Sequence, residues 1–278
     1  MDQQMNVKNE ILNMEPVFVT APTGRNGITL IQRLLNSSHD IIVYGENSHL
    51  VSVIPHQVNA IIPFMNNKKE LDQAFEHFRN GNVDGWTSNL WPGVMRYVGI
   101  TLENAYRYYE YYAEFSKDNG FSQWGIKNPL TGPKMVQNIR TLLKRTRFIL
   151  IYRNIFSVAR SAKARNFISN ISQLGHFAQQ WQDNLMPFLK KEIDRVLCIQ
   201  YENLVQNPEP EIQKLELFGK VKGIDRSVMD RKINTFKGNT ENGHSPDQYI
   251  DPVELSCEEV EIITDRAAQT LEMTGYQP

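Results

Sequence analysis

Cysteine is scarce in this sequence, and neither sign of charge predominates. Among 278 residues there are two cysteines, Cys198 and Cys257, which excludes a disulfide framework and offers no zinc-binding spacing. The 30 Lys and Arg residues nearly balance the 31 Asp and Glu residues, so no general nucleic-acid or membrane partner is expected. No run approaches the roughly 18 apolar residues of a membrane span, and residues 1–16 lack the apolar core of a signal peptide. We therefore expect a soluble, cytoplasmic protein.

Short apolar runs alternate with helical patterns along the chain. Four apolar or β-branched runs predict strands at 17–20, 41–47, 146–154 and 195–204, and residues 123–129 are either a fifth strand or the end of one. Helical patterns follow the first run and occupy 102–117, 131–144, 155–166, 174–192 and 208–218. The run at 146–154 has few polar breaks, which is typical of a parallel strand covered on both faces. These patterns predict an α/β fold of three layers, α/β/α, whose central layer is a mostly parallel sheet of about 4–5 strands.

No internal repeat or long low-complexity linker divides the chain, so a single domain over residues 1–278 is expected. Two stretches lack clear periodicity, residues 52–100 and 220–250. We interpret both as irregular insertions that could cover a site.

The stretch "VFVTAPTGRNGITLIQRLLN" (17–36) combines a strand, a glycine-containing turn and the start of a helix. Such a turn points backbone N–H groups and the positive end of a helix dipole at one position, which suits an anion. Ile28 stands where a nucleoside triphosphatase has its lysine, so a magnesium-bound triphosphate is disfavoured. Arg25 and Thr29 still provide a cation and a hydroxyl for a smaller anion. An ordinary strand-to-helix turn would explain this stretch equally well.

A second stretch, "RFILIYRNIFSVARSAKAR", delivers Arg153 at the carboxyl end of a predicted strand and Ser161 about two turns into a helix. In open α/β sheets, ligands bind outside the carboxyl ends of the strands. Arg153 can form a bidentate pair with a phosphate, and the Ser161 hydroxyl can add a donor. Taken alone, the stretch also fits a solvated arginine and a helical serine.

Together these stretches resemble the sulfotransferases that use 3′-phosphoadenosine 5′-phosphosulfate (PAPS). Residues 17–36 are similar to the family's 5′-phosphosulfate loop, and "IYRNIFSVARS" is similar to its 3′-phosphate motif. "CIQYENLVQNPEPEIQKLELFG" resembles a later segment of the family, and the three occur in the family's order over about residues 16–220. The departures are Asn26 for serine, Ile28 for threonine and Ile155 for proline.

The resemblance implies a P-loop NTPase-like sulfotransferase fold, PAPS as donor, 3′-phosphoadenosine 5′-phosphate (PAP) as product, and no metal. It assigns donor binding to two groups of residues. The two main motifs contribute Thr23, Gly24, Arg25, Asn26, Gly27, Ile28, Thr29, Arg153 and Ser161. Later segments contribute Lys237, Gly238 and Tyr201, and for Tyr201 a packing role is preferred over a contact on the adenine side. Residues 221–278 are expected to cover the donor site.

The resemblance also assigns the catalytic residues. Glu46, after the second predicted strand, lies where many family members carry a glutamate, and a carboxylate there can take the acceptor's proton. His49 is the alternative base, and a surface glutamate in a turn is the other interpretation of Glu46. Lys127 and Arg25 would stabilise charge on the bridging oxygen during in-line transfer of the sulfuryl group.

The acceptor is expected to be a small molecule. "TLENAYRYYEYYAEFSK" contains five tyrosines, and a helix would place Tyr106 and Glu110 on one face. A pocket of aromatics and carboxylates would suit a cationic acceptor, as in bacterial natural-product tailoring sulfotransferases of the saxitoxin type. An amphipathic helix that packs its tyrosines is the alternative. A small-molecule kinase of the P-loop type and a PAP-binding protein without turnover are the competing functions.

Overall fold

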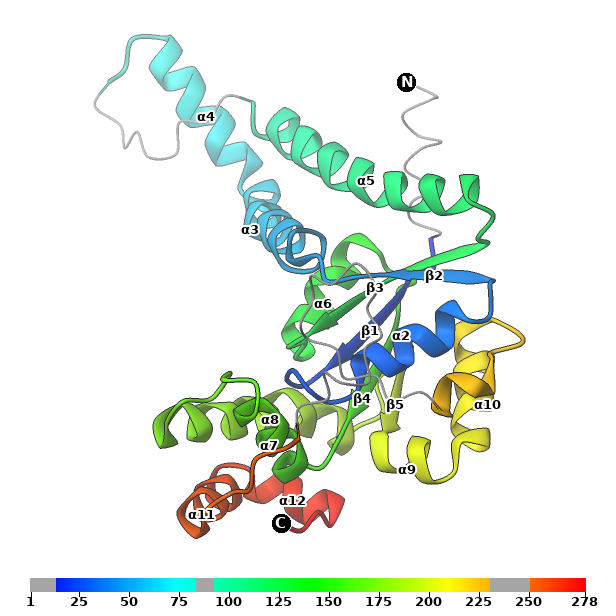
Figure 1. Cartoon of the computed structure of the whole chain (residues 1–278). Helices are drawn as coiled ribbons and strands as arrows, with labels where there is room; N and C mark the ends of the chain where they lie inside the picture. The colour runs from blue at the N-terminus through cyan, green and yellow to red at the C-terminus, as the bar shows by residue number, and fades with distance from the viewer. Residues whose placement is uncertain (1–13, 84–92, 231–250) are drawn as a thin grey trace.

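The computed structural model describes residues 14–83, 93–230 and 251–278 (Figure 1). Its five strands form one sheet in which every described pairing is parallel, in the order β2-β3-β1-β4-β5. The strands are β1 (Val17–Ala21), β2 (Ile41–Tyr44), β3 (Gln123–Pro129), β4 (Arg147–Tyr152) and β5 (Val196–Gln200). The α/β class and the parallel sheet predicted from the sequence are confirmed.

Strand β1 lies at the centre of the sheet and marks the point where the strand order reverses. The chain passes from β1 to the edge strand β2, returns to β3 beside β1, and then places β4 on the other side of β1. A crevice forms at such a reversal, outside the carboxyl ends of the strands. The loops after β1, β3 and β4 therefore converge on one place.

Helices cover both faces of the sheet (Figure 1). In chain order they are α2 (Ile28–Asn36), α3 (Ile54–Asn66), α4 (Lys68–Arg79), α5 (Val94–Asp118), α6 (Pro133–Leu142), α7 (Ile155–Lys163), α8 (Ile171–Lys190), α9 (Tyr201–Gln206), α10 (Pro208–Gly219), α11 (Cys257–Arg266) and α12 (Ala268–Thr274). A π-helical turn, η1 (His49–Val53), precedes α3, and a 3₁₀ turn, η3 (Arg226–Asp230), follows α10. No helix in the described ranges has the length and apolar character needed to cross a membrane.

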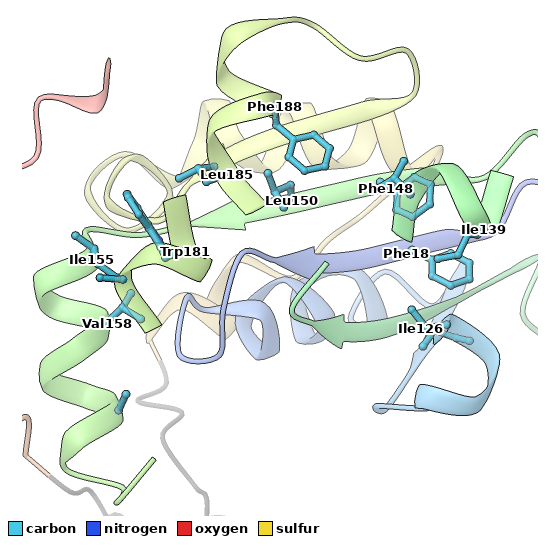
Figure 2. Close-up of a cluster of buried hydrophobic side chains, with 14 of the residues drawn as sticks. Phe18, Ile126, Ile139, Phe148, Leu150, Ile155, Val158, Trp181, Leu185 and Phe188 are labelled. Atoms are coloured by element: carbon cyan, nitrogen blue, oxygen red, sulfur yellow. The ribbon is translucent and has the colours of Figure 1, made fainter. Parts of the chain in front are cut away.

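Alternation along the strands divides the buried side chains into two cores. Phe18, Phe148 and Leu150 face the larger core, which also takes up Trp181 of α8 (Figure 2). Val19 and its neighbours on the opposite face pack against α2 and α10. Because successive strand residues point to opposite faces, a continuously apolar strand is what a sheet covered on both sides requires.

The prediction that residues 52–100 are irregular was wrong for most of the described part. Helices α3 and α4 occupy residues 54–79, and α5 begins at residue 94. Ile54, Val58 and Ile61 recur at i, i+4 and i+7 and are buried, so one face of α3 packs on the rest of the protein. Two prolines in α3 obscured that periodicity, although one of them is at its first turn.

Three predicted strands also end earlier than expected, one of them β4, which stops at Tyr152 rather than at residue 154. Strand β2 stops at Tyr44, where its pairing with β3 ends, and β5 stops at Gln200, where its pairing with β4 ends. Residues 201–204, predicted as strand, instead begin α9, which buries Leu204. Of the expected irregular segment 220–250, residues 231–250 lie outside the described ranges.

Candidate active site

The loop after β1 has the backbone conformation of an anion-binding turn. Arg25 and Gly27 both have left-handed backbones, with φ of 70° and 98°. Helix α2 begins at Ile28, and its N-cap residue, Gly27, has no side chain that could bond the first N–H groups of the helix. Alternating left- and right-handed residues before an uncapped helix direct several N–H groups toward one point, as anion sites require.

Asn26 holds this loop together from inside. Its side chain is fully buried and donates to the carbonyl and hydroxyl oxygens of Thr23, both at 2.9 Å. Its Oδ1 accepts from the Arg153 backbone N–H at 3.0 Å. Both ends of the amide are thus engaged within the protein. Of the groups on Asn26, only the backbone N–H is therefore left to bind an anion, so the side chain has no part in the donor binding expected of this residue.

Two more residues assigned to the donor contribute backbone rather than side chain. Thr23 is fully buried, and its hydroxyl also donates to the Gly24 carbonyl at 3.3 Å. The side chain of Ile28 is 7% exposed and packs in the smaller core. Ile28, at the position where a nucleoside triphosphatase has its lysine, is therefore a core residue.

The two predicted phosphate motifs meet in space. Arg25 Nε donates to Ser161 Oγ at 3.1 Å, although the residues are 136 positions apart. Arg153 lies at the end of β4, and its guanidinium carbon is 4.5 Å from the centre of the Tyr201 ring. Cation–π contact holds Arg153 without neutralising its charge, so the arginine can still pair with a phosphate.

Tyr201 also borders the loop. A Cβ added to Gly27 would lie 2.6 Å from Tyr201 Cδ2 and 2.9 Å from Cε2. The aromatic ring therefore packs directly against the backbone of the turn. The alternative given for Tyr201, a packing role, accounts for the contacts that the structure places around it.

Lys127 connects the loop to the predicted base. Its Nζ donates to Thr29 Oγ1 at 3.4 Å and lies 3.4 Å from Glu46 Oε1. The Lys127 side chain is 14% exposed and that of Glu46 is 55% exposed, so the carboxylate faces solvent while the ammonium is largely enclosed. Asn36 of α2 fixes the end of β2 by accepting from the Val43 N–H at 2.7 Å. The strand end that carries Glu46 is thereby tied to the helix of the loop.

His49 lies in a cavity whose lining begins at Asn47, the residue after Glu46. The cavity has a volume of about 520 Å³. Its lining is mainly aromatic and polar: Asn47, His49, Leu50, Asn104, Arg107, Tyr108, Tyr111 and Tyr112. The rings of His49 and Tyr108 meet edge to face with centroids 5.0 Å apart. A second cavity of about 390 Å³ shares Asn104 and Tyr108 and continues between α3 and α5.

Tyr106 and Glu110, the predicted acceptor residues, lie on a different face of α5 and line neither of these cavities. Tyr106 packs against the larger core, and burial raises the pKa of its phenol. The cavity residues Asn104, Tyr108 and Tyr111 follow one another at i, i+4 and i+7 along α5. That spacing in the sequence could have identified them.

Lys237 and Gly238 lie outside the described residues. Within the described ranges, no three His, Cys, Asp or Glu side chains gather in a way that would hold a metal ion. The charged side chains that the structure brings to the loop and the neighbouring strand ends include Arg25, Lys127, Arg153 and Glu46.

Comparisons with known structures give sulfotransferase domains. The sulfotransferase domain of the Synechococcus PCC 7002 olefin synthase superposes with a TM-score of 0.51 at 15% identity, covering 96% of each chain. The sulfotransferase domain of the curacin biosynthetic pathway gives 0.49 at 15% identity, covering 95% of this chain and 98% of that one. Sulfotransferase STF9 of Mycobacterium avium gives 0.49 at 11% identity, covering 97% and 79%. At such identities the first of these similarities establishes the fold alone.

No curated protein matches significantly. The profile of the sulfotransferase family matches residues 16–222, which is most of the chain and includes every strand, both predicted phosphate motifs, Glu46 and Lys127. The chain therefore belongs to the sulfotransferase family.

Proposed function

We propose that this protein transfers the sulfuryl group of PAPS to a hydroxyl or amine/carbamoyl nitrogen of a small molecule, with Glu46 as the base. One observation carries the proposal: Lys127 Nζ lies 3.4 Å from both Thr29 Oγ1 and Glu46 Oε1. The anion-binding loop, a cation and a solvent-facing carboxylate thus meet at the carboxyl edge of the sheet. Sulfuryl transfer needs a loop that binds the donor, a base that takes the acceptor's proton, and a cation between them.

The donor fits the available charges. The loop, with Arg25 and Thr29, suits the 5′-phosphosulfate, while Arg153 and Ser161 suit the 3′-phosphate. The Arg25–Ser161 hydrogen bond of 3.1 Å supports placing both halves in one site. A phosphosulfate has no metal-bridged triphosphate chain, so the buried Ile28 leaves no charge unbalanced.

The residues would act on the transfer as follows. Glu46 takes the proton of the acceptor as the acceptor's oxygen or nitrogen forms its bond to sulfur. At the same time the bond between sulfur and the bridging oxygen breaks, and its electron pair stays on the phosphate of PAP. Lys127 and Arg25 lie where they can stabilise that developing negative charge. Alignment of acceptor and donor supplies much of the remaining rate enhancement.

The aromatic cavity beside His49 is the acceptor site in this proposal. Its lining begins at Asn47, directly after Glu46, and its aromatic rings offer apolar surface with a few polar groups, as small-molecule sites do. A cationic acceptor and the saxitoxin-type assignment stay predictions, and cationic amines belong in any acceptor panel beside neutral alcohols.

Calorimetric titration with PAP, AMP and magnesium-ATP tests the donor. We expect selective binding of PAP, and Arg153→Ala should weaken it about 10- to 100-fold, because a charge-assisted phosphate contact is worth about 1.5–3 kcal/mol. Arg79→Ala, on the exposed surface of α4, is the matched control and should change nothing. Tighter binding of ATP would support the kinase alternative. Selective PAP binding without release of PAP from PAPS, across the whole acceptor panel, would support a non-catalytic binding protein.

Tyr108→Ala tests the acceptor cavity. The side chain lines both cavities and packs on His49, so its loss should raise the KM for the best acceptor about tenfold, the effect of about 1.4 kcal/mol of lost contact. Steady-state release of PAP measures it, and the affinity for PAP should not change. Phe115→Ala, also exposed on α5 but outside both linings, is the control. An unchanged KM in Tyr108→Ala would place the acceptor elsewhere.

A further inference from the structure

The last residues of the sequence lie against the turn between β4 and α7, which carries Arg153. One carboxylate joins them: Glu202 Oε1 accepts from the Asn154 backbone N–H at 2.9 Å, and Oε2 accepts from the Tyr276 hydroxyl at 2.7 Å. Asn154 Nδ2 donates in turn to the Gln277 carbonyl at 2.8 Å. The C-terminal residues Tyr276 and Gln277 thus close a ring of hydrogen bonds with Asn154 and Glu202.

Tyr276 is well placed to be a permanent donor in this ring. It is 9% exposed, and its aromatic ring packs on Tyr152 and Trp181, with centroids 6.4 and 6.5 Å apart. Burial raises the pKa of Tyr276, and the neighbouring Glu202 carboxylate raises it further. The phenol therefore stays protonated and donates to Glu202 over the whole physiological range.

The ring acts on the backbone that positions the 3′-phosphate residues. Asn154 directly follows Arg153 and caps α7, the helix of Ser161, by accepting from the Phe156 N–H at 2.9 Å. Glu202 directly follows Tyr201, whose ring lies against the Arg153 guanidinium. Asn154 is thus the chain neighbour of Arg153 itself, and Glu202 is the chain neighbour of the tyrosine that contacts Arg153.

Residues 251–278, here called the C-terminal tail, also contact α7 and α8 before the chain reaches Tyr276. Helix α11 pairs with α7 through Lys163 and Glu259, 2.6 Å apart, and the Val253 N–H donates to the Arg160 carbonyl at 3.3 Å. The Thr270 N–H donates to Gln182 of α8 at 3.2 Å. Figure 1 shows α11 and α12 lying beside α7 and α8. Residues 251–278 all follow the segment matched by the family profile, which ends at residue 222.

We propose that Tyr276 and Glu202 are positioning residues through which the C-terminal tail fixes Arg153 for the 3′-phosphate of the donor. The inference rests on the proposed use of PAPS. It differs from a general stabilising role in one measurable way. A tail that merely stabilises the fold would affect all nucleotides alike, whereas a tail that positions Arg153 affects only ligands that carry a 3′-phosphate.

The test compares calorimetric affinities for PAP and for AMP, which lacks the 3′-phosphate. In Tyr276→Phe the preference for PAP over AMP should fall about tenfold with AMP binding unchanged, the scale expected for one hydrogen bond to a charged group. Glu202→Ala should do the same, and the double variant should lose no more than Glu202→Ala alone, because both act through one contact. Glu202→Gln keeps an acceptor for Asn154 and should retain most of the preference.

Tyr109→Phe is the matched control, since it removes another buried tyrosine hydroxyl, the one that donates to the Leu50 carbonyl at 2.6 Å. It should leave the PAP preference intact. Wild-type protein without any PAP preference would overturn the proposed function and this inference with it. A wild-type preference that survives in both Tyr276→Phe and Glu202→Ala, or parallel losses for PAP and AMP, would overturn the positioning role alone.

Discussion

Glu46→Gln is expected to lower kcat by about 10²- to 10⁴-fold while the affinity for PAP stays at the wild-type value, because an amide cannot take the acceptor's proton. The substitution preserves the size of the side chain and leaves Lys127 beside Thr29. Glu46 is 55% exposed, so its replacement should not affect folding. Release of PAP from PAPS with the best acceptor measures kcat, and calorimetry measures PAP affinity.

Two further variants make this result interpretable. Glu76→Gln removes an exposed carboxylate from α4 that pairs with Arg79, and it should leave kcat unchanged. His49→Ala tests the alternative base, and we expect it to act mainly on the acceptor KM, because His49 lies in the cavity lining against Tyr108. Loss of kcat in His49→Ala with wild-type kcat in Glu46→Gln would transfer the role of base to His49.

The sheet could be predicted because its signals are local. Four of the five strands are short apolar runs followed by a polar or glycine-containing break, whereas β3 is less apolar and includes Lys127 and Asn128. The segment that was missed, residues 54–79, buries only a narrow stripe in α3 and few side chains in α4. Because so many of its residues are polar, the helical periodicity is hard to see in the sequence. The few buried apolar residues of α3 are enough to hold the helix because they pack on α5 and α6.

In the candidate site, too, some residues could be predicted from the sequence and others could not. Arg25, Lys127, Arg153 and Glu46 could be placed together because each follows or ends a parallel strand. The internal use of Asn26 could not be predicted, because its partners include the backbone at Arg153, 127 positions away. The link from Glu202 to Tyr276 spans 74 positions and depends on how α11 and α12 pack, for which no local pattern exists.

Gly27→Ala is expected to weaken PAP binding about tenfold to a hundredfold and to lower the midpoint of thermal unfolding. The backbone of Gly27 has φ of 98°, and holding alanine there costs about 1–3 kcal/mol. The new Cβ would also lie 2.6 Å from Tyr201 Cδ2, so the loop or the ring has to move. Since 1.4 kcal/mol corresponds to a factor of ten in affinity, these costs account for the expected loss.

The movement would reach the 3′-phosphate residues as well, because the Tyr201 ring also contacts the Arg153 guanidinium. For that reason Gly27→Ala should weaken PAP more than AMP, even though the substitution lies in the 5′ loop. Gly120→Ala, between α5 and β3, is the matched control: its backbone is also left-handed, with φ of 86°, but no atom lies within 4 Å of the added Cβ, so PAP binding should stay as in the wild type. Equal tolerance of alanine at both glycines would mean that the turn is not held against Tyr201, and the close packing of ring and loop would then have no part in donor binding.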